Sequence, residues 1–367
     1  MKKKLVGAPF WILALLLVLG IVAISCGGDD EPVPAEIIVG AIHVGPISDA
    51  GYNEAHYNGL KVMEENIPGL VLLEAENVPE SADAERVMEN MIRQGATIIF
   101  AQSFGYLDPA LNVAADNPDV VFEHPAGYKL ADNFGTYWAK SDQLTYALGM
   151  AAGKLTKTNK LGFIGGFPIP QLISQVNAFH LGARSVNPDV ETRAIYNGAW
   201  SDPGKEAAAT NTLADLGVDV VTMVVDSPIT VVQTAENRGM LTIGYHSADV
   251  QQFAPNGWIS GIDFTWGGFF TQVVKDVQDG TWEPEHVRGD LESGMVGLAP
   301  WGPAVPDDVR QACENKIQEF IDGTAEVFEG PIMDTDGVVR IAEGEVGDPD
   351  LSNTMDWYVE GVIGRTN

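Results

Sequence analysis

Apolar runs and helical patterns alternate along most of this chain, and this alternation restricts its fold more than any other feature. Runs such as EIIVGAIHV (36–44), ATIIFA (96–101) and VDVVTMVV (218–225) are each followed by a helical pattern. Strands that alternate with helices of roughly 10–15 residues are typical of βαβ units. Such units form parallel sheets with helices on both faces, because their crossovers are right-handed.

The alternation occurs twice. The first series ends at NFGTYWA (133–139), and the second begins at KLGFIGG (160–166). A chain of 367 residues can form two domains, each with its own core. We therefore predict an α/β protein with two doubly wound, Rossmann-like parallel-sheet lobes joined by a hinge. The predicted lobes are 36–139 plus 263–287 (lobe 1) and 140–262 plus 288–367 (lobe 2), with crossings near 139–141, 262–266 and 286–290.

The N-terminus has the pattern of a secretory signal, because MKKK precedes an uncharged apolar stretch that ends at Ser25. The segment Ala23-Ile24-Ser25-Cys26 resembles the lipobox of bacterial lipoproteins, which implies cleavage before Cys26 and lipid on its sulfur. We predict a signal peptide at 1–25, a tether at 26–35 and a lipid-anchored protein on the extracytoplasmic face of the cell membrane. The alternative is an uncleaved membrane-spanning anchor.

Charge and composition exclude several kinds of partner. The formal net charge is −30, which repels phosphate backbones and argues against nucleic acid as a partner. Cys26 and Cys313 are the two cysteines, so we expect no disulfide framework and no thiolate metal cluster. The six histidines lack metal-ligand spacing, and GFIGGF (162–167) lacks the order of a dinucleotide motif. We therefore expect no metal, no cofactor and no catalytic residue.

Three dipeptides predict where helices begin. Asp108-Pro109, Asp202-Pro203 and Ser227-Pro228 each place a capping side chain before a proline at the first helical position. Each follows an apolar run, so these helices start at the carboxyl ends of strands, where open α/β sheets bind ligands. The predicted site therefore lies among the loops at 43–53, 102–108, 198–203, 226–228 and 245–249.

Aromatic rings and polar side chains share these loops. Flat rings stack on planar ligands, and Asp and Asn side chains form hydrogen bonds with ring N–H groups and acceptors. The pattern predicts a site for a neutral heterocycle. Some of these residues also have structural alternatives, such as packing for the rings, loop ordering for Asn53 and a buried structural role for His43. The candidate ligand-binding residues are His43, Tyr52, Asn53, Phe104, Trp200, Asp226 and Asp249.

Tyr52-Asn53 after the SDAG loop is similar to the D-x-S-F-N signature of the basic membrane protein family of lipoproteins. The similarity continues through further segments in the same order. These are ADNPDVVFEHPAGY (115–128), AGKLTKTNKLGFIGGFPIP (152–170), NAFHLGA (177–183), GAWSDPGKEAAA (198–209) and FEGPIMDTDG (328–337).

The resemblance implies a type 1 periplasmic-binding-protein fold and a substrate-binding component of an ABC transporter, with a permease as its partner and no enzymatic activity. It also implies that two lobes close over a purine, with Tyr52 and Trp200 on opposite faces of the ring. Asp226 and Asp249 fall at polar positions of the second lobe. His43 falls where nucleoside-binding members often carry an acid.

One departure from the family pattern bears on the ligand. Nucleoside-binding members carry a Lys in the strand that here reads WISGIDFTWGG (258–268), which has Asp263 and Trp266 but no Lys. The difference favours a free purine base such as adenine or hypoxanthine over a nucleoside. A sugar or autoinducer receptor of the same fold remains an alternative. An extracytoplasmic nucleoside hydrolase is disfavoured because no D-x-x-x-D-D motif occurs.

Overall fold

The computed structural model describes residues 37–303 and 305–366. The predicted signal peptide and the whole predicted tether, including Cys26, lie outside these residues. Within the described part of the chain, no helix combines the length and the apolar character needed to cross a membrane.

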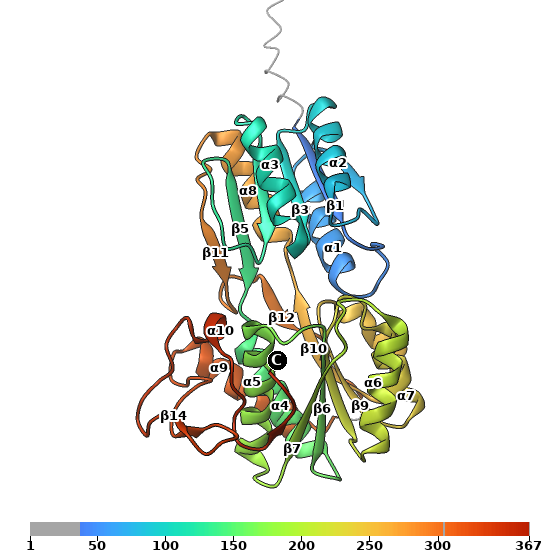
Figure 1. Cartoon of the computed structure of the whole chain (residues 1–367), viewed down its shortest axis with the longest axis vertical. Coiled ribbons are helices and arrows are strands. Elements are labelled where there is room, and N and C mark those ends of the chain that lie inside the picture. Colours follow the sequence, from blue (N-terminus) through green and yellow to red (C-terminus); the bar gives the residue numbers. More distant parts are fainter. Residues whose placement is uncertain (1–36, 304, 367) are drawn as a thin grey trace, which may run out of the picture. The chain divides into compact units, whose positions relative to one another are not determined.

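Two parallel sheets organise residues 37–366 (Figure 1). The sheet of lobe 1 has six strands in the order β11-β5-β4-β3-β1-β2, and the sheet of lobe 2 has seven in the order β12-β10-β9-β8-β6-β7-β15. All neighbours are parallel except β10 and β12. The strands of lobe 1 are β1 (Ile38–His43), β2 (Val71–Ala75), β3 (Ile98–Gln102), β4 (Val121–Pro125), β5 (Phe134–Ala139) and β11 (His286–Gly289). Those of lobe 2 are β6 (Lys160–Gly165), β7 (Glu191–Tyr196), β8 (Val220–Val224), β9 (Leu241–Gly244), β10 (Trp258–Phe264), β12 (Val296–Leu298) and β15 (Val362–Ile363), with a separate hairpin of β13 (Ile332–Met333) and β14 (Val339–Ile341).

Helices cover both faces of each sheet (Figure 1). In lobe 1, α1 (Tyr52–Asn66) packs with α8 (Gly267–Asp279) on one face, and α2 (Ala82–Arg93) packs with α3 (Leu107–Asp116) on the other. In lobe 2, α4 (Asp142–Leu155) packs with α5 (Pro170–Val186), and α6 (Pro203–Asp215) packs with α7 (Ile229–Asn237). The remaining helical segments are α9 (Asp307–Ile321), α10 (Leu351–Thr354) and the 3₁₀ turns η1 (Phe104–Tyr106) and η2 (Ala248–Phe253). The predicted doubly wound architecture is confirmed.

The chain passes between the two sheets at three places. It leaves lobe 1 between β5 and α4, returns between β10 and α8, and leaves again between β11 and β12. Three connections therefore join the lobes, and the second runs in the opposite direction to the other two. Lobe 1 is therefore built from two separate stretches of sequence.

Only one of the three predicted helix caps is correct. The Asp202 carboxylate accepts a hydrogen bond from the backbone N–H of Lys205, and Pro203 is the first residue of α6. Asp108 is not a cap, because η1 runs directly into α3 and places Asp108 inside the first turn, where it pairs with Lys129 at 2.7 Å. Ser227 is not a cap either, since α7 begins at Ile229 and Pro228 holds the capping position.

Glycine allows α4 and α5 to approach each other closely. A Cβ atom on Gly182 of α5 would fall well inside contact distance of the Tyr146 carbonyl oxygen of α4, and one on Gly149 would meet the Phe179 carbonyl oxygen. Backbone atoms cannot move aside as a flexible side chain can. The two helices are therefore fixed at a separation that a methyl group would not permit.

We expect Gly182→Ala to lower the free energy of unfolding by about 1–3 kcal/mol, because the added methyl group overpacks the contact between α4 and α5. The matched control is Gly268→Ala on α8, where no atom lies within 4 Å of the new methyl group. The control should raise stability by about 0.4–1 kcal/mol through the unfolded state. Urea unfolding of both variants measures the difference, and equal stabilities would contradict the packing argument.

Candidate functional site

A line of backbone hydrogen bonds connects the two lobes at the carboxyl ends of their strands. The backbone N–H of Tyr52, the first residue of α1, donates to the carbonyl oxygen of Asp226 at 2.8 Å. The N–H of Asp226, which follows β8, donates in turn to the carbonyl oxygen of Trp200 at 2.8 Å. Three of the predicted site residues, distant in sequence, therefore lie along one line.

Asp49 shapes the loop that carries Tyr52. Its carboxylate accepts hydrogen bonds from the backbone N–H groups of Gly51 (2.9 Å), Asn53 (3.1 Å) and Glu54 (3.0 Å). It also accepts one from the side-chain amide of Asn53 at 2.7 Å, and the Asn53 oxygen accepts from the N–H of Gly45 at 3.1 Å. Asp49 thus satisfies the free N–H groups at the start of α1, and Asn53 orders the preceding loop.

Gly51 permits close contact between the lobes. A Cβ atom at this position would overlap the carbonyl oxygen of Asp226 and the ring of Pro228, both in lobe 2. The hydrogen bond from Tyr52 to Asp226 needs this close approach. The structure is therefore a closed form, in which lobe 1 touches lobe 2 through backbone atoms.

The two predicted aromatic residues have different surroundings. Tyr52 is buried and lies between His56 of α1 and His246 of lobe 2, with ring centroids 4.4 Å and 5.3 Å away. Trp200 is half-buried, and its ring lies 5.3 Å from that of Phe167 and against Gly166. The backbones of Tyr52 and Trp200 are brought together, and each ring has its own aromatic neighbours.

The remaining predicted residues lie around this line. His43 ends β1 and is fully buried, with its Nε2 atom 3.4 Å from Glu74 Oε1. Phe104 is 49% exposed at the start of η1. Asp249 is exposed on η2, where its backbone N–H donates to Ser247 Oγ at 3.2 Å. These three residues occupy the carboxyl edges that the sequence predicts.

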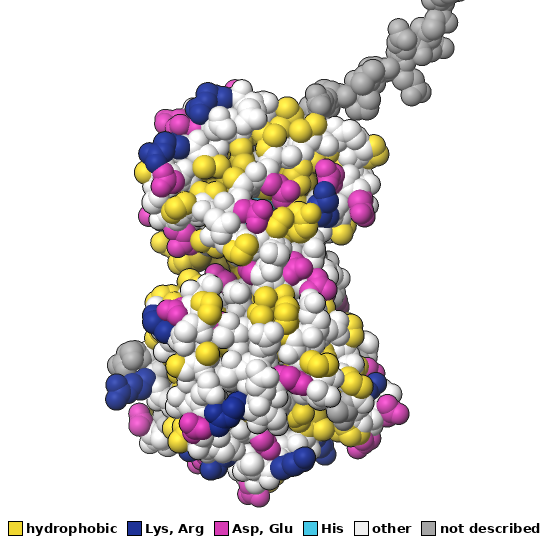
Figure 2. Space-filling model, turned by 90° about the vertical axis from the view of Figure 1, so that its right-hand side faces the viewer, with side chains coloured by type: hydrophobic (Ala, Val, Ile, Leu, Met, Phe, Trp, Pro, Cys, Tyr) yellow, Lys and Arg dark blue, Asp and Glu magenta, His cyan; other side chains and the backbone are white. Residues whose placement is uncertain are grey.

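Acidic groups gather where the lobes meet. Burial, followed by the nearby charges of Asp49, Glu80 and Glu206, raises the pKa of Asp226 to about 8. Burial and the facing Asp249 carboxylate raise the pKa of Glu54 to about 7. Figure 2 shows Asp and Glu side chains on both sides of the groove between the lobes. At neutral pH the closed form therefore holds Asp226 largely protonated.

The histidines at the same interface are neutral. Burial lowers the pKa of His56 to about 3, and it has the same effect on His246. Sequence reasoning did not select either residue as a site residue. The spacing of His56, one helical turn after Tyr52, was an available signal, because residues four apart on a helix lie on the same face.

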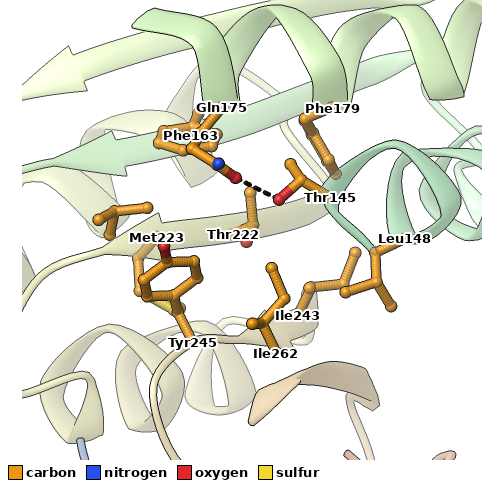
Figure 3. A pocket seen from close by; sticks show the side chains of 11 residues that line it. Thr145, Leu148, Phe163, Gln175, Phe179, Thr222, Met223, Ile243, Tyr245 and Ile262 are labelled. Carbon is orange, nitrogen blue, oxygen red and sulfur yellow. Dashed lines mark hydrogen bonds between the residues drawn. The ribbon is translucent and has the colours of Figure 1, made fainter. Parts of the chain in front are cut away.

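Two other hollows in the described residues differ in kind. A cavity of about 10 Å³ lies inside lobe 2 and is lined in part by Tyr245. Figure 3 shows Thr145 donating a hydrogen bond to Gln175 in its wall. This volume holds about one water molecule. A hollow of about 300 Å³ near the C-terminus is lined by charged groups that pair with each other, such as Arg340 with Asp334 at 2.6 Å. The interface between the lobes is the better candidate for an organic ligand.

Two doubly wound lobes joined by three connections, with aromatic and polar residues where they meet, form an architecture found in two-lobed solute-binding proteins. A solved ABC transporter solute-binding protein from Conexibacter woesei has this fold, with a TM-score of 0.67 and 21% sequence identity over 79% of this chain and 98% of that one. This likeness shows the type 1 periplasmic-binding-protein fold.

The family follows from sequence. The model of the Bmp family, described as ABC transporter substrate-binding protein PnrA-like, matches residues 37–327. A purine-binding protein of Brucella abortus is 38% identical over 88% of this chain and 92% of its own length. A putative ABC transporter glucose-binding protein of Haloferax volcanii is 33% identical over 88% of this chain and 80% of its own. The chain belongs to the Bmp family of extracytoplasmic ABC transporter substrate-binding proteins.

We expect Gly51→Ala to disfavour the closed form, because the added methyl group overlaps the carbonyl oxygen of Asp226. Small-angle X-ray scattering should then give a larger radius of gyration than for the wild type. Gly268→Ala, in open space on lobe 1, controls for the chemical change. Identical scattering from Gly51→Ala and the wild type would mean that this contact does not hold the lobes together.

We expect Glu54→Gln to gain stability relative to the wild type as the pH rises from 5 to 7.5. The pKa of Glu54 in the folded protein lies above its ordinary value of 4.5. The favourable contribution of Glu54 to the free energy of unfolding is therefore complete below pH 4.5 and is lost as the pH rises through about 7. Urea unfolding at the two pH values measures the effect. Glu65→Gln, an exposed change on the same helix, is the control, and parallel pH profiles for both variants would refute the prediction.

Proposed function

We propose that this protein is a lipid-anchored receptor that captures a purine base between its lobes and delivers it to an ABC permease. The observation that carries the proposal is the line from Trp200 through Asp226 to Tyr52, which joins the lobes at the strand ends. Identity of 38% to a purine-binding protein over most of both chains supports the same ligand class.

The proposed mechanism is closure around the ligand. Tyr52 and Trp200 supply aromatic surface from the two lobes, and the Asp226 carboxyl group lies beside them. A carboxyl group that is largely protonated at neutral pH can donate a hydrogen bond to a ring nitrogen or an oxo group, whereas a carboxylate can only accept one. A ligand drives closure only through its higher affinity for the closed form. Burial of both faces of a ring contributes roughly 25 cal/mol per Å² of apolar area, which is compatible with micromolar binding or tighter.

The proposed site also includes Asn53, Phe104, His43 and Asp249. Asn53 keeps the Tyr52 loop in place through Gly45 and Asp49. Phe104 offers an exposed ring at the end of β3. We propose a base and not a nucleoside, because the segment at 258–268 contains no Lys to hold a ribose.

Glucose is the second candidate ligand. The observation that favours it is the 33% identity to a putative glucose-binding protein. Aromatic faces and carboxyl groups also serve sugar sites, so both ligand classes fit the general character of the interface. The proposed lipid anchor on Cys26 and the permease partner are the same for either ligand.

Small molecules released from the purified protein should include adenine or hypoxanthine, detected by mass spectrometry. Recovery of a hexose or a pentose would show that the ligand is a sugar and not a purine base. Conversion of added inosine to free base would show an enzyme and end the receptor proposal.

Trp200→Ala should weaken adenine binding, measured by isothermal titration calorimetry, by at least about tenfold, because stacking on one face of the ring is lost. The matched control is Trp301→Ala, which removes another half-buried indole of lobe 2, one that donates to Glu314 at 3.0 Å. The control should bind adenine with wild-type affinity. Equal affinity of both variants would remove Trp200 from the site.

A further inference from the structure

Seven buried side chains of lobe 1 carry polar atoms that have no hydrogen-bond partner among the described residues, and five of these side chains lie behind Tyr52. We call these five the lobe 1 polar cluster. None is more than 1% exposed. The cluster is His43 (Nδ1), His56 (Nε2), Gln102 (Oε1 and Nε2), Tyr137 (hydroxyl) and Trp266 (Nε1).

The fold brings these residues to one place. His43 and Gln102 are register partners at the ends of β1 and β3. Gln102 faces the same way as Phe100, two residues earlier, whose ring lies 4.4 Å from Phe270 of α8. The cluster therefore lies between the lobe 1 sheet and the pair of helices α1 and α8.

Ring distances connect the other members. The His56 ring lies 6.0 Å from that of Tyr137 and 5.3 Å from that of Trp266, and the rings of Tyr137 and Trp266 are 5.3 Å apart. Gln102 lies near the Tyr137 hydroxyl, but no hydrogen bond of normal geometry joins them. The five side chains form one group.

The cluster lies directly behind Tyr52. The Tyr52 ring contacts His56 at 4.4 Å on one side and His246 of lobe 2 at 5.3 Å on the other. The contact with His246 exists only while the lobes are together. Separation of the lobes therefore uncovers Tyr52, and the polar cluster is the next layer inward from it.

The hydrogen bonds that the two histidines make help to show whether their unpaired ring nitrogens are donors or acceptors. His56 Nδ1 lies 2.8 Å from the Tyr52 carbonyl oxygen, which can only accept, so Nδ1 carries the proton and Nε2 is a free acceptor. His43 Nε2 lies 3.4 Å from Glu74 Oε1, which can only accept, so Nε2 carries a proton and Nδ1 is left without a partner. Trp266 Nε1 is a donor, while Gln102 and Tyr137 can do both. The cluster offers a mixture of donors and acceptors.

A buried polar atom without a partner is costly, by roughly 1–3 kcal/mol each. Lobe 1 satisfies a comparable group at Tyr106, although Glu123 Oε2 and both ring nitrogens of His124 are also without a partner. The hydroxyl of Tyr106, equally buried, donates to the Val78 carbonyl oxygen at 2.5 Å. Five unsatisfied side chains in one group, beside the interface where the lobes separate, are therefore better explained by a ligand than by packing.

We propose that the lobe 1 polar cluster forms the specificity subsite of the receptor and reads the hydrogen-bonding edge of a neutral, planar nitrogen heterocycle. This inference rests on the proposed function. In it, Tyr52 covers a face of the ring, and Gln102 and Tyr137 bind its edge. A mixed donor and acceptor edge on a planar ring is complementary to this set.

The test uses Tyr137→Phe and Gln102→Met, which remove polar atoms and keep the size of each side chain. Each variant should weaken adenine binding, measured by isothermal titration calorimetry, by about tenfold. The melting temperature without ligand should stay the same or rise, since an unpaired polar group has been removed. Tyr106→Phe is the matched control, because it breaks a hydrogen bond within lobe 1 and should lower the melting temperature while leaving adenine affinity unchanged.

The outcomes separate the two proposals. Wild-type protein that binds glucose and neither adenine nor hypoxanthine overturns the proposed function. Wild-type protein that binds adenine, with both variants binding equally well, overturns the subsite and leaves the function standing. A lower melting temperature for unliganded Tyr137→Phe also overturns the subsite, because the hydroxyl would then have a partner within the protein.

Discussion

The contact on which the closed form depends is a hydrogen bond between backbone atoms of the two lobes, from Tyr52 to Asp226. It exists because Gly51 has no side chain and because Asp49 holds the start of α1 in position. Side-chain contacts between lobes adapt to a change of angle, but a backbone hydrogen bond at 2.8 Å does not. The position of Tyr52 relative to lobe 2 is thus fixed to within the tolerance of one hydrogen bond.

The buried acidic groups and the buried histidines near the interface have opposite pH dependences. Asp226 and Glu54 have raised pKa values and favour the folded form at low pH, whereas His56 and His246 have lowered pKa values and favour it at high pH. All four groups are disfavoured in their charged forms for the same reason, which is burial. The closed interface is thus suited to an uncharged ligand, although the surface of the chain is strongly acidic.

The fold could be predicted from the sequence because its signals are local and repeated. Strand runs such as that of β8 and the cap at Asp202 can be recognised within about ten residues of sequence. Asp108 and Ser227 could not be assigned correctly in this way, because the turn that precedes each helix decides where the helix starts. The strand-end rule located the region of the candidate site, but it could not reveal His56 or Tyr137, which reach that region from within a helix and a strand and depend on how α1 packs on the sheet.

The three connections between the lobes have a consequence for how the chain folds. Residues 267–289 belong to lobe 1, although they follow most of lobe 2 in the sequence. They form β11, the edge strand of the lobe 1 sheet, and α8, which covers one face of that sheet together with α1. As the chain emerges from its amino end, lobe 1 stays incomplete until that segment arrives, with an open sheet edge and an uncovered apolar face. Such surfaces are where non-native association starts. Completion of the first lobe is therefore a late event, and newly emerged chain needs protection for longer than a protein whose domains follow one another in sequence.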